Sequence, residues 1–100
     1  MTFIKYNKRK NMQLRASHIL VETEQQAQQL IEQIKSGADF GEVARHNSRC
    51  PSGRNGGDLG MFPTGAMVPE FERAVVENAV GSLVGPVRTQ FGYHVIQRTA

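Results

Sequence analysis

The order of apolar and polar positions divides the first half of the chain into one strand and two helices. In residues 13–21, apolar residues alternate with polar ones before an Ile-Leu-Val run, which is typical of a strand that becomes fully buried. Thr23 is a candidate N-cap for a following helix, because apolar residues then recur at helical spacing up to Gly37. A second, shorter helix is expected to begin at Asp39, another capping residue type, and to end near residue 47.

The second half of the chain contains shorter elements separated by turn-forming residues. Residues 47–57 are rich in Gly, Ser and Asn and show no apolar period, so we expect a loop there. Beyond this loop the pattern predicts, in order, a strand over 58–62, a helix from Pro69 to about Asn78, and strands over 87–89 and 93–98. The order strand, helix, helix, strand, helix, strand, strand predicts an α+β fold, in which helices pack on a small sheet.

The positive charge of the chain is concentrated at its start. A length of 100 residues is enough for one domain, and the formal net charge is +3. Five of the twelve Lys and Arg residues lie within the first fifteen positions, whereas from residue 16 onward seven basic residues face nine acidic ones. We therefore expect residues 1–12 to form a basic, flexible N-terminal extension and residues 13–100 to form a single domain. Nucleic-acid binding is not expected, because the positive charge is confined to this extension.

Several other classes of protein are disfavoured by the sequence. No apolar run approaches the ~20 residues of a membrane span. The first twelve residues lack the apolar stretch of a secretory signal, so a cytoplasmic location is expected. One cysteine cannot form an internal disulfide, which agrees with that location. The possible metal ligands come one per element without close pairs, so neither a metal nor another cofactor is expected.

Three residues are candidates for catalytic chemistry. Cys50 lies in the Gly-rich loop between Arg49 and Arg54, and positive charge nearby favours the thiolate form. His18 lies in the first predicted strand and His94 in the last, so antiparallel pairing of these strands would bring the imidazoles together. A cysteine with two histidines suggests a nucleophile and a base. Each residue also has a structural explanation, because single cysteines and strand histidines are often simply buried.

Four large apolar residues lie near turns or helix starts rather than in the middle of elements: Leu59, Met67, Phe71 and Phe91. Ordinary core packing explains each of them. Their concentration around turns is also typical of a shallow apolar pocket.

These residues belong to a longer pattern that resembles the parvulin family of peptidyl-prolyl cis/trans isomerases, most of all its small stand-alone bacterial members. The matching strings extend from about Gln13 to Arg98 in the family's order and spacing. They are Ser17-His18-Ile19-Leu20-Val21, Gly37-Ala38-Asp39-Phe40, Cys50-Pro51-Ser52-Gly53, Gly56-Gly57-Asp58-Leu59-Gly60, Met67-Val68-Pro69 with Phe71, Gly85-Pro86-Val87, and Thr89-Gln90-Phe91-Gly92-Tyr93-His94-Val95-Ile96.

The resemblance implies a four-stranded antiparallel sheet surrounded by helices, with an active groove on one side. It also implies roles for individual residues. His18 and His94 match the family's paired histidines, and Cys50 matches its active-site cysteine. The substrate-binding positions implied in this way are Leu59, Met67 and Phe71 around the proline ring, Thr89 as a hydroxyl that hydrogen-bonds the histidine pair, and Phe91 at the rim of the groove.

The activity implied by the resemblance is noncovalent acceleration of rotation about Xaa–Pro bonds, which assists protein folding. Its substrates would be proline-containing polypeptides, and the domain is expected to act as a monomer. The loop of residues 22–24 is acidic, so preference for a phosphorylated residue before the proline is not expected. The alternative is a non-catalytic chaperone or binding module, which needs only the apolar surface.

Overall fold

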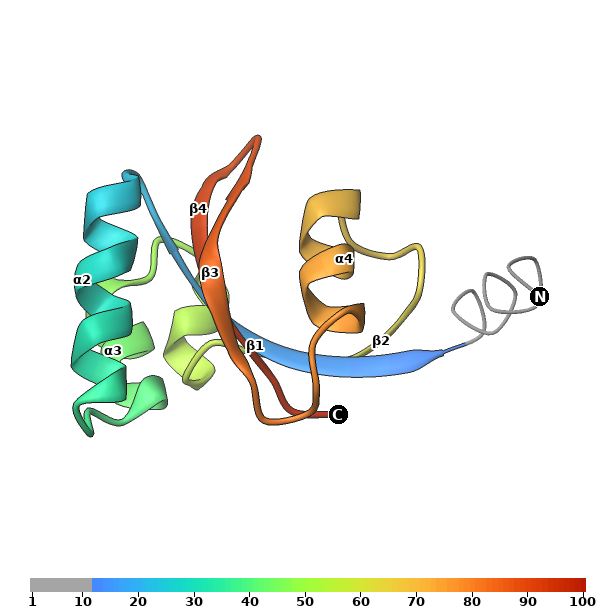
Figure 1. Ribbon diagram of the computed structural model, residues 1–100, viewed down its shortest axis with the longest axis horizontal. Coiled ribbons are helices and arrows are strands. Elements are labelled where there is room, and N and C mark those ends of the chain that lie inside the picture. Colours follow the sequence, from blue (N-terminus) through green and yellow to red (C-terminus); the bar gives the residue numbers. More distant parts are fainter. Residues whose placement is uncertain (1–11) are drawn as a thin grey trace.

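The computed structural model describes residues 12–100, which form an antiparallel sheet with helices on both faces (Figure 1). The elements in chain order are β1 (Gln13–Val21), α2 (Glu24–Lys35), α3 (Phe40–Asn47), the 3-10 helix η1 (Pro51–Asn55), β2 (Asp58–Pro63), α4 (Pro69–Val76), β3 (Leu83–Thr89) and β4 (Gly92–Arg98). The sheet has the order β2-β1-β4-β3, and each neighbouring pair of strands is antiparallel. The α+β class and the order of strands and helices are those predicted from the sequence.

The alternation along β1 separates two cores on opposite faces of the sheet. Successive side chains of a strand point to opposite faces. Leu14 and Ala16 therefore pack on the face covered by α4, whereas Ile19 and Val21 pack on the face covered by α2 and α3 (Figure 1). His18 has the same parity as Leu14 and Ala16, so the strand presents its imidazole to the α4 face. A one-residue slip of β1 would move this imidazole to the wrong core.

The two cores are formed by separate sets of buried residues. The core under α2 and α3 consists of Ile19, Val21, Ala27, Leu30, Val43, Ala44 and Val95. The core under α4 consists of Leu14, Ala16, Phe62, Phe71, Val75 and Ile96. Both sets combine residues distant in the sequence, so the central strands β1 and β4 are held from both sides.

Helix capping fixes where the helices begin. The Thr23 hydroxyl accepts a hydrogen bond from the Gln26 N–H at 3.1 Å, and the Gln26 side chain accepts one from the Thr23 N–H at 3.1 Å. This reciprocal pair is a capping box. The Asp39 carboxylate caps α3 by accepting from the Glu42 N–H at 3.0 Å. Both caps were expected from the sequence.

Two elements differ from the sequence-based expectation. Part of the predicted loop 47–57 is the 3-10 helix η1, because five residues are too few to show a helical period. Strand β3 begins at Leu83, four residues before the expected start. Gly85 and Pro86 are tolerated inside it because β3 is an edge strand, and its register shifts between Val84 and Val87.

The described part of the domain begins one residue earlier than predicted. The Met12 carbonyl accepts a hydrogen bond from the Thr64 N–H at 3.1 Å, and its side chain packs against the core under α4. Met12 therefore belongs to the domain rather than to the expected extension, whose residues 1–11 lie outside the described residues. Among the described helices, none is both long and apolar enough to cross a membrane.

Candidate active site

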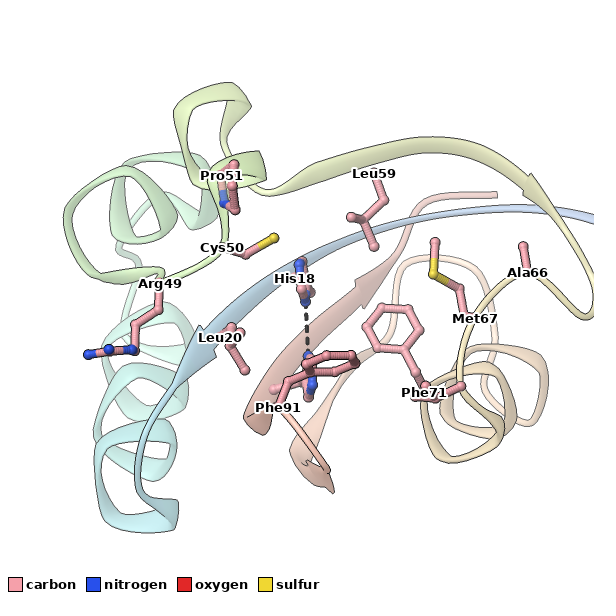
Figure 2. A pocket seen from close by; sticks show the side chains of 12 residues that line it. His18, Leu20, Arg49, Cys50, Pro51, Leu59, Ala66, Met67, Phe71 and Phe91 are labelled. Carbon is pink, nitrogen blue, oxygen red and sulfur yellow. Dashed lines mark hydrogen bonds between the residues drawn. The ribbon is translucent and has the colours of Figure 1, made fainter.

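The pairing of β1 with β4 brings His18 and His94 together. Leu20 is opposite His94 in the register, and His18 is opposite Ile96, so the two histidines are diagonal neighbours on the same face. Their Nδ1 atoms lie 2.9 Å apart, and the ring planes are within 19° of parallel. The antiparallel pairing proposed from the sequence is confirmed, and with it the contact of the imidazoles, which is the dashed line at His18 in Figure 2.

A chain of hydrogen bonds assigns the proton positions on both rings. The Thr89 hydroxyl oxygen accepts from the Phe91 N–H at 3.2 Å and lies 2.7 Å from His94 Nε2. Thr89 is buried, so its hydroxyl hydrogen needs an acceptor, and among residues 12–100 that acceptor is His94 Nε2. His94 then carries its hydrogen on Nδ1 and donates it to His18 Nδ1, which leaves the hydrogen of His18 on Nε2.

Both imidazoles are held in the neutral form. Burial, followed by the charge of His94, lowers the pKa of His18 to about 4, and burial also lowers the pKa of His94. The His18 Nε2 atom is buried without a hydrogen-bond partner among the described residues. The site thus contains one buried, unpaired N–H donor next to the apolar pocket.

Phe71 of α4 packs against both histidines. Its ring contacts His18 edge-on at a centroid distance of 5.5 Å and His94 at 5.4 Å. Phe71 is buried, and it belongs both to the core under α4 and to the wall of the pocket. Because the ring also packs against the core residue Phe62, the position of the histidines depends on the docking of α4.

Cys50 is half-buried at the start of η1, and the Ser52 hydroxyl donates a hydrogen bond to its Sγ at 3.2 Å. Arg49, a neighbour of the thiol in the sequence, pairs with Glu22 at 3.3 Å and points away from Cys50 (Figure 2). The sequence analysis missed Ser52, although its place two residues after the cysteine is a spacing at which hydroxyls bond to local groups.

The loop that carries Cys50 is attached to β1 next to His18. The His18 N–H donates to the Gly57 carbonyl at 2.9 Å, and the Leu20 N–H donates to the Ser48 hydroxyl oxygen at 3.0 Å. Gly57 has φ +85°, and a Cβ at this position would collide with the His18 carbonyl oxygen. Only glycine permits this close approach, which fixes the distance between the cysteine loop and the histidines.

The predicted residues surround one open cavity of about 490 Å³ (Figure 2). Its lining consists of His18, Leu20, Arg49, Cys50, Pro51, Leu59, Ala66, Met67, Val68, Phe71, Phe91 and His94. Seven of the eight predicted site residues are therefore in the lining. The eighth, Thr89, is buried behind His94 and makes the expected hydrogen bond to the histidine pair, but it is not in the lining that a substrate would contact.

The sequence analysis did not assign the remaining lining residues to the pocket. Leu20 could have been found, because it lies two positions after His18 and therefore on the same face of β1. Ala66 and Val68 flank Met67 in the segment before α4, where no period reveals which side chains face inward. No group of three or more His, Cys, Asp or Glu residues suited to a metal ion occurs among residues 12–100.

Comparisons with known proteins agree with the geometry of this site. The family model of the PPIC-type PPIase domain matches residues 1–100. The chain belongs to this family. It is 44% identical over 95 residues to the foldase protein PrsA of Geobacillus sp. (strain WCH70), a match that covers 94% of this chain and 34% of the relative. It is also 42% identical over 88 residues to foldase protein PrsA 2 of Bacillus anthracis, covering 87% and 31%.

Solved structures support the same assignment. The crystal structure of the peptidylprolyl isomerase PrsA from Bacillus anthracis has a TM-score of 0.89 at 39% identity and covers 93% of this chain and 43% of that one. The parvulin NmPin of Nitrosopumilus maritimus has a TM-score of 0.80 at 38% identity, and the match covers 90% and 97%. A Campylobacter jejuni structure, from work describing PEB4 and periplasmic Cj1289 as SurA-like chaperones, has a TM-score of 0.84 at 35% identity, with coverage of 98% and 44%.

The matched PPIC-type domain has a different extent in these relatives. It spans about a third of the curated PrsA proteins but nearly all of the parvulin NmPin. The fold is thus shared by the longer PrsA proteins and by a parvulin of about this chain's length.

Proposed function

We propose that the chain is a peptidyl-prolyl cis/trans isomerase that acts on proline-containing segments of unfolded or flexible proteins and so assists their folding. The observation that carries this function is the apolar cavity built directly on the neutral histidine pair. The family assignment agrees with it.

The reaction requires a site that prefers a twisted amide to a planar one. The planar form is held by C–N double-bond character, with a barrier of ~18–20 kcal/mol. A catalyst lowers this barrier only by interactions that are stronger in the twisted state. A ten-thousandfold acceleration corresponds to a preference of about 5.4 kcal/mol.

The pocket can supply this preference in two ways. Leu59, Met67 and Phe71 bind the proline ring, while the preceding residue stays free to rotate. Twisting removes the conjugation that polarises the amide, so a desolvated apolar cavity favours the twisted form. The unpaired Nε2–H of His18 favours the twisted form where it is directed at the proline nitrogen, because twisting localises the nitrogen lone pair, and this donor needs no reorganisation during rotation.

Cys50 acts without forming a covalent bond in this mechanism. Rotation breaks no bond and needs no acyl intermediate, so the reaction has no step that requires a nucleophile. The hydrogen bond from Ser52 fixes the direction of the sulfur. Cys50 thereby shapes the pocket on the side of the rotating carbonyl.

Phosphate-directed recognition is not part of the proposal. The segment after β1 carries Glu22 and Glu24, and Glu22 pairs with Arg49 at the edge of the pocket. This segment therefore offers no basic cluster to a phosphate on the residue before the proline. The apolar rim around exposed Phe91 favours an uncharged or hydrophobic residue directly before the proline.

A holding function without catalysis is the second candidate, because the apolar pocket alone would bind unfolded chains and one similar structure is described among chaperones. Refolding of a protein limited by proline isomerisation separates the two. An isomerase speeds the slow phase at one chain per hundred substrate molecules. A holdase changes refolding only at stoichiometric amounts. The cytoplasmic location and the monomeric state expected from the sequence stay predictions.

A further inference from the structure

A second cavity, of about 350 Å³, adjoins the pocket at the junction of α3 and η1. Its lining consists of Arg45, Ser48, Arg49, Cys50, Pro51, Gly53 and Arg54. The two cavities share Arg49, Cys50 and Pro51. A peptide bound with its proline against Met67 and Phe71 therefore reaches the second cavity by crossing Cys50, at the end of the pocket away from Met67 (Figure 2). We call the second cavity the arginine pocket, after Arg45, Arg49 and Arg54.

The arginine pocket has about one positive charge that no neighbour balances. Arg45 pairs with Glu42 at 2.6 Å, and Arg49 pairs with Glu22 at 3.3 Å. The Arg54 side chain has no ion pair or hydrogen bond with any residue in the described range 12–100. Both existing pairs are exposed and therefore weak, so their arginines can turn toward an incoming anion.

Ser48 gives this pocket a directed donor. Its hydroxyl oxygen accepts hydrogen bonds from the Leu20 N–H at 3.0 Å and from the Cys50 N–H at 3.3 Å. A hydroxyl oxygen that accepts two hydrogen bonds has used both of its lone pairs. Its hydrogen has no acceptor among the described residues, so it is available to a ligand in the arginine pocket.

We propose that the arginine pocket binds the carboxylate of an Asp or Glu two residues before the proline of the substrate. This proposal rests on the isomerase function. In an extended peptide, residues two apart point to the same face and are separated by about 6.6 Å. The proline and the residue two before it then point to the same side of the peptide, whereas the residue between them points to the opposite side. One unbalanced positive charge suits a carboxylate rather than a doubly charged phosphate.

The test uses peptides that differ only at this position. Each has Ala directly before the proline and Glu, Gln or Lys one residue earlier, and kcat/KM is measured by a conformation-specific protease assay at low salt. We expect the Glu peptide to be favoured over the Gln peptide by about threefold, the size of an exposed ion pair. The preference should fall as salt is raised. It should be absent when Glu is moved to the position directly before the proline.

Two variants link the preference to the arginine pocket. In Arg54→Gln the Glu-to-Gln ratio of kcat/KM should fall to about one, and in Arg54→Glu the Lys peptide should become the better substrate. Arg73→Gln is the matched control, because Arg73 is an exposed arginine on α4 that lines neither cavity. Equal rates for the three peptides in the unmodified chain, or an unchanged ratio in Arg54→Gln, would overturn the proposal. Failure to accelerate any peptide would instead contradict the isomerase function.

Discussion

The Nδ1 atoms of His18 and His94 are 2.9 Å apart, so the two rings share a single hydrogen between them. The next link in the same chain, from the Thr89 hydroxyl to His94 Nε2, decides which ring carries it. Both rings are neutral in this arrangement, and each is packed against Phe71. The histidines therefore set the shape and polarity of the pocket floor, and they do not need to move protons.

Acid should destabilise the fold through these histidines. Burial lowers the pKa of His18 to about 4 and also lowers that of His94, from an unperturbed value of 6.5. Below pH 6.5 the unfolded chain binds protons that the folded chain does not, so this stability is fully present above pH 6.5 and is lost as pH falls toward 4. Through His18, the free energy of unfolding should fall by about 2 kcal/mol between pH 7.5 and pH 5. Urea unfolding at the two pH values measures this difference.

Asp58 contributes little to the change in stability in that window. The hydrogen bond from Arg15 lowers the pKa of Asp58, so this group stays ionised at pH 5. The variant His18→Gln should show a clearly smaller loss of stability between pH 7.5 and 5. An equal loss in the variant would assign the effect to other groups.

Activity should be nearly independent of pH between 6 and 8. The pKa of His18, lowered by burial to about 4, keeps this ring neutral in this range, and burial lowers the pKa of His94 in the same direction. A plot of kcat/KM against pH on an uncharged peptide tests this directly. A steep limb near pH 6.5 would mean that a histidine gains or loses a proton during turnover.

Thr89→Val should lower the free energy of unfolding, although residue 89 is not part of the pocket lining. The change keeps the shape of the residue but leaves His94 Nε2 and the Phe91 N–H without their hydrogen-bond partner. We expect a loss of about 1–3 kcal/mol in unfolding free energy. Thr89→Ser, which keeps the hydroxyl, should retain most of the stability. Imidazole nitrogen shifts should show the His94 tautomer kept in Thr89→Ser and altered in Thr89→Val; an unaltered tautomer in both would contradict the proton assignment.

Met67→Ala should reduce catalysis more than stability. Met67 is half-buried in the wall of the pocket, and losing its thioether removes apolar contact with the proline ring. At roughly 0.8 kcal/mol per buried methylene, kcat/KM should fall about tenfold or more. Met61→Ala is the matched control, because Met61 is exposed on β2 and lies outside the pocket lining. Similar losses in both variants would place the proline ring elsewhere.

Cys50→Ser should remain active. A hydroxyl can keep the hydrogen bond with Ser52, so the loss in kcat/KM should stay below about tenfold. Loss of a covalent nucleophile lowers rates by several orders of magnitude. Mass spectrometry of the unmodified chain during turnover should show no adduct. A trapped tetrahedral adduct between the Cys50 sulfur and the amide carbonyl carbon, or an inactive but folded Cys50→Ser, would restore the covalent mechanism.

The sequence predicts those parts of the fold that depend on a regular period or on capping. The bounds of β1 follow from side-chain alternation. The start of α2 directly after its N-cap Thr23 follows from a hydroxyl before a helical period. The start of β3 could not be predicted, because Gly85 and Pro86 are unfavourable in a central strand. Only the position of β3 at the sheet edge, which is a tertiary property, makes them acceptable.

The site residues with distinctive chemistry could be predicted from the sequence. Contacts that depend on the backbone conformation of a loop could not. His18, His94 and Cys50 were named from the sequence because few residue types perform such chemistry. The bond from Ser52 to Cys50 depends on the 3-10 turn of η1, which no period reveals. The pairing of Arg49 with Glu22 depends on the loop lying beside the end of β1.

The most direct test of the central claim measures the isomerisation rate itself. Exchange NMR on a short peptide with one proline gives the cis-to-trans rate and the cis:trans ratio in the same spectra. At a hundredfold excess of peptide, the account predicts a rate that rises in proportion to the amount of chain, while the ratio stays the same. Signals that broaden through binding while the rate remains at its uncatalysed value would show that the pocket holds proline segments without turning them over.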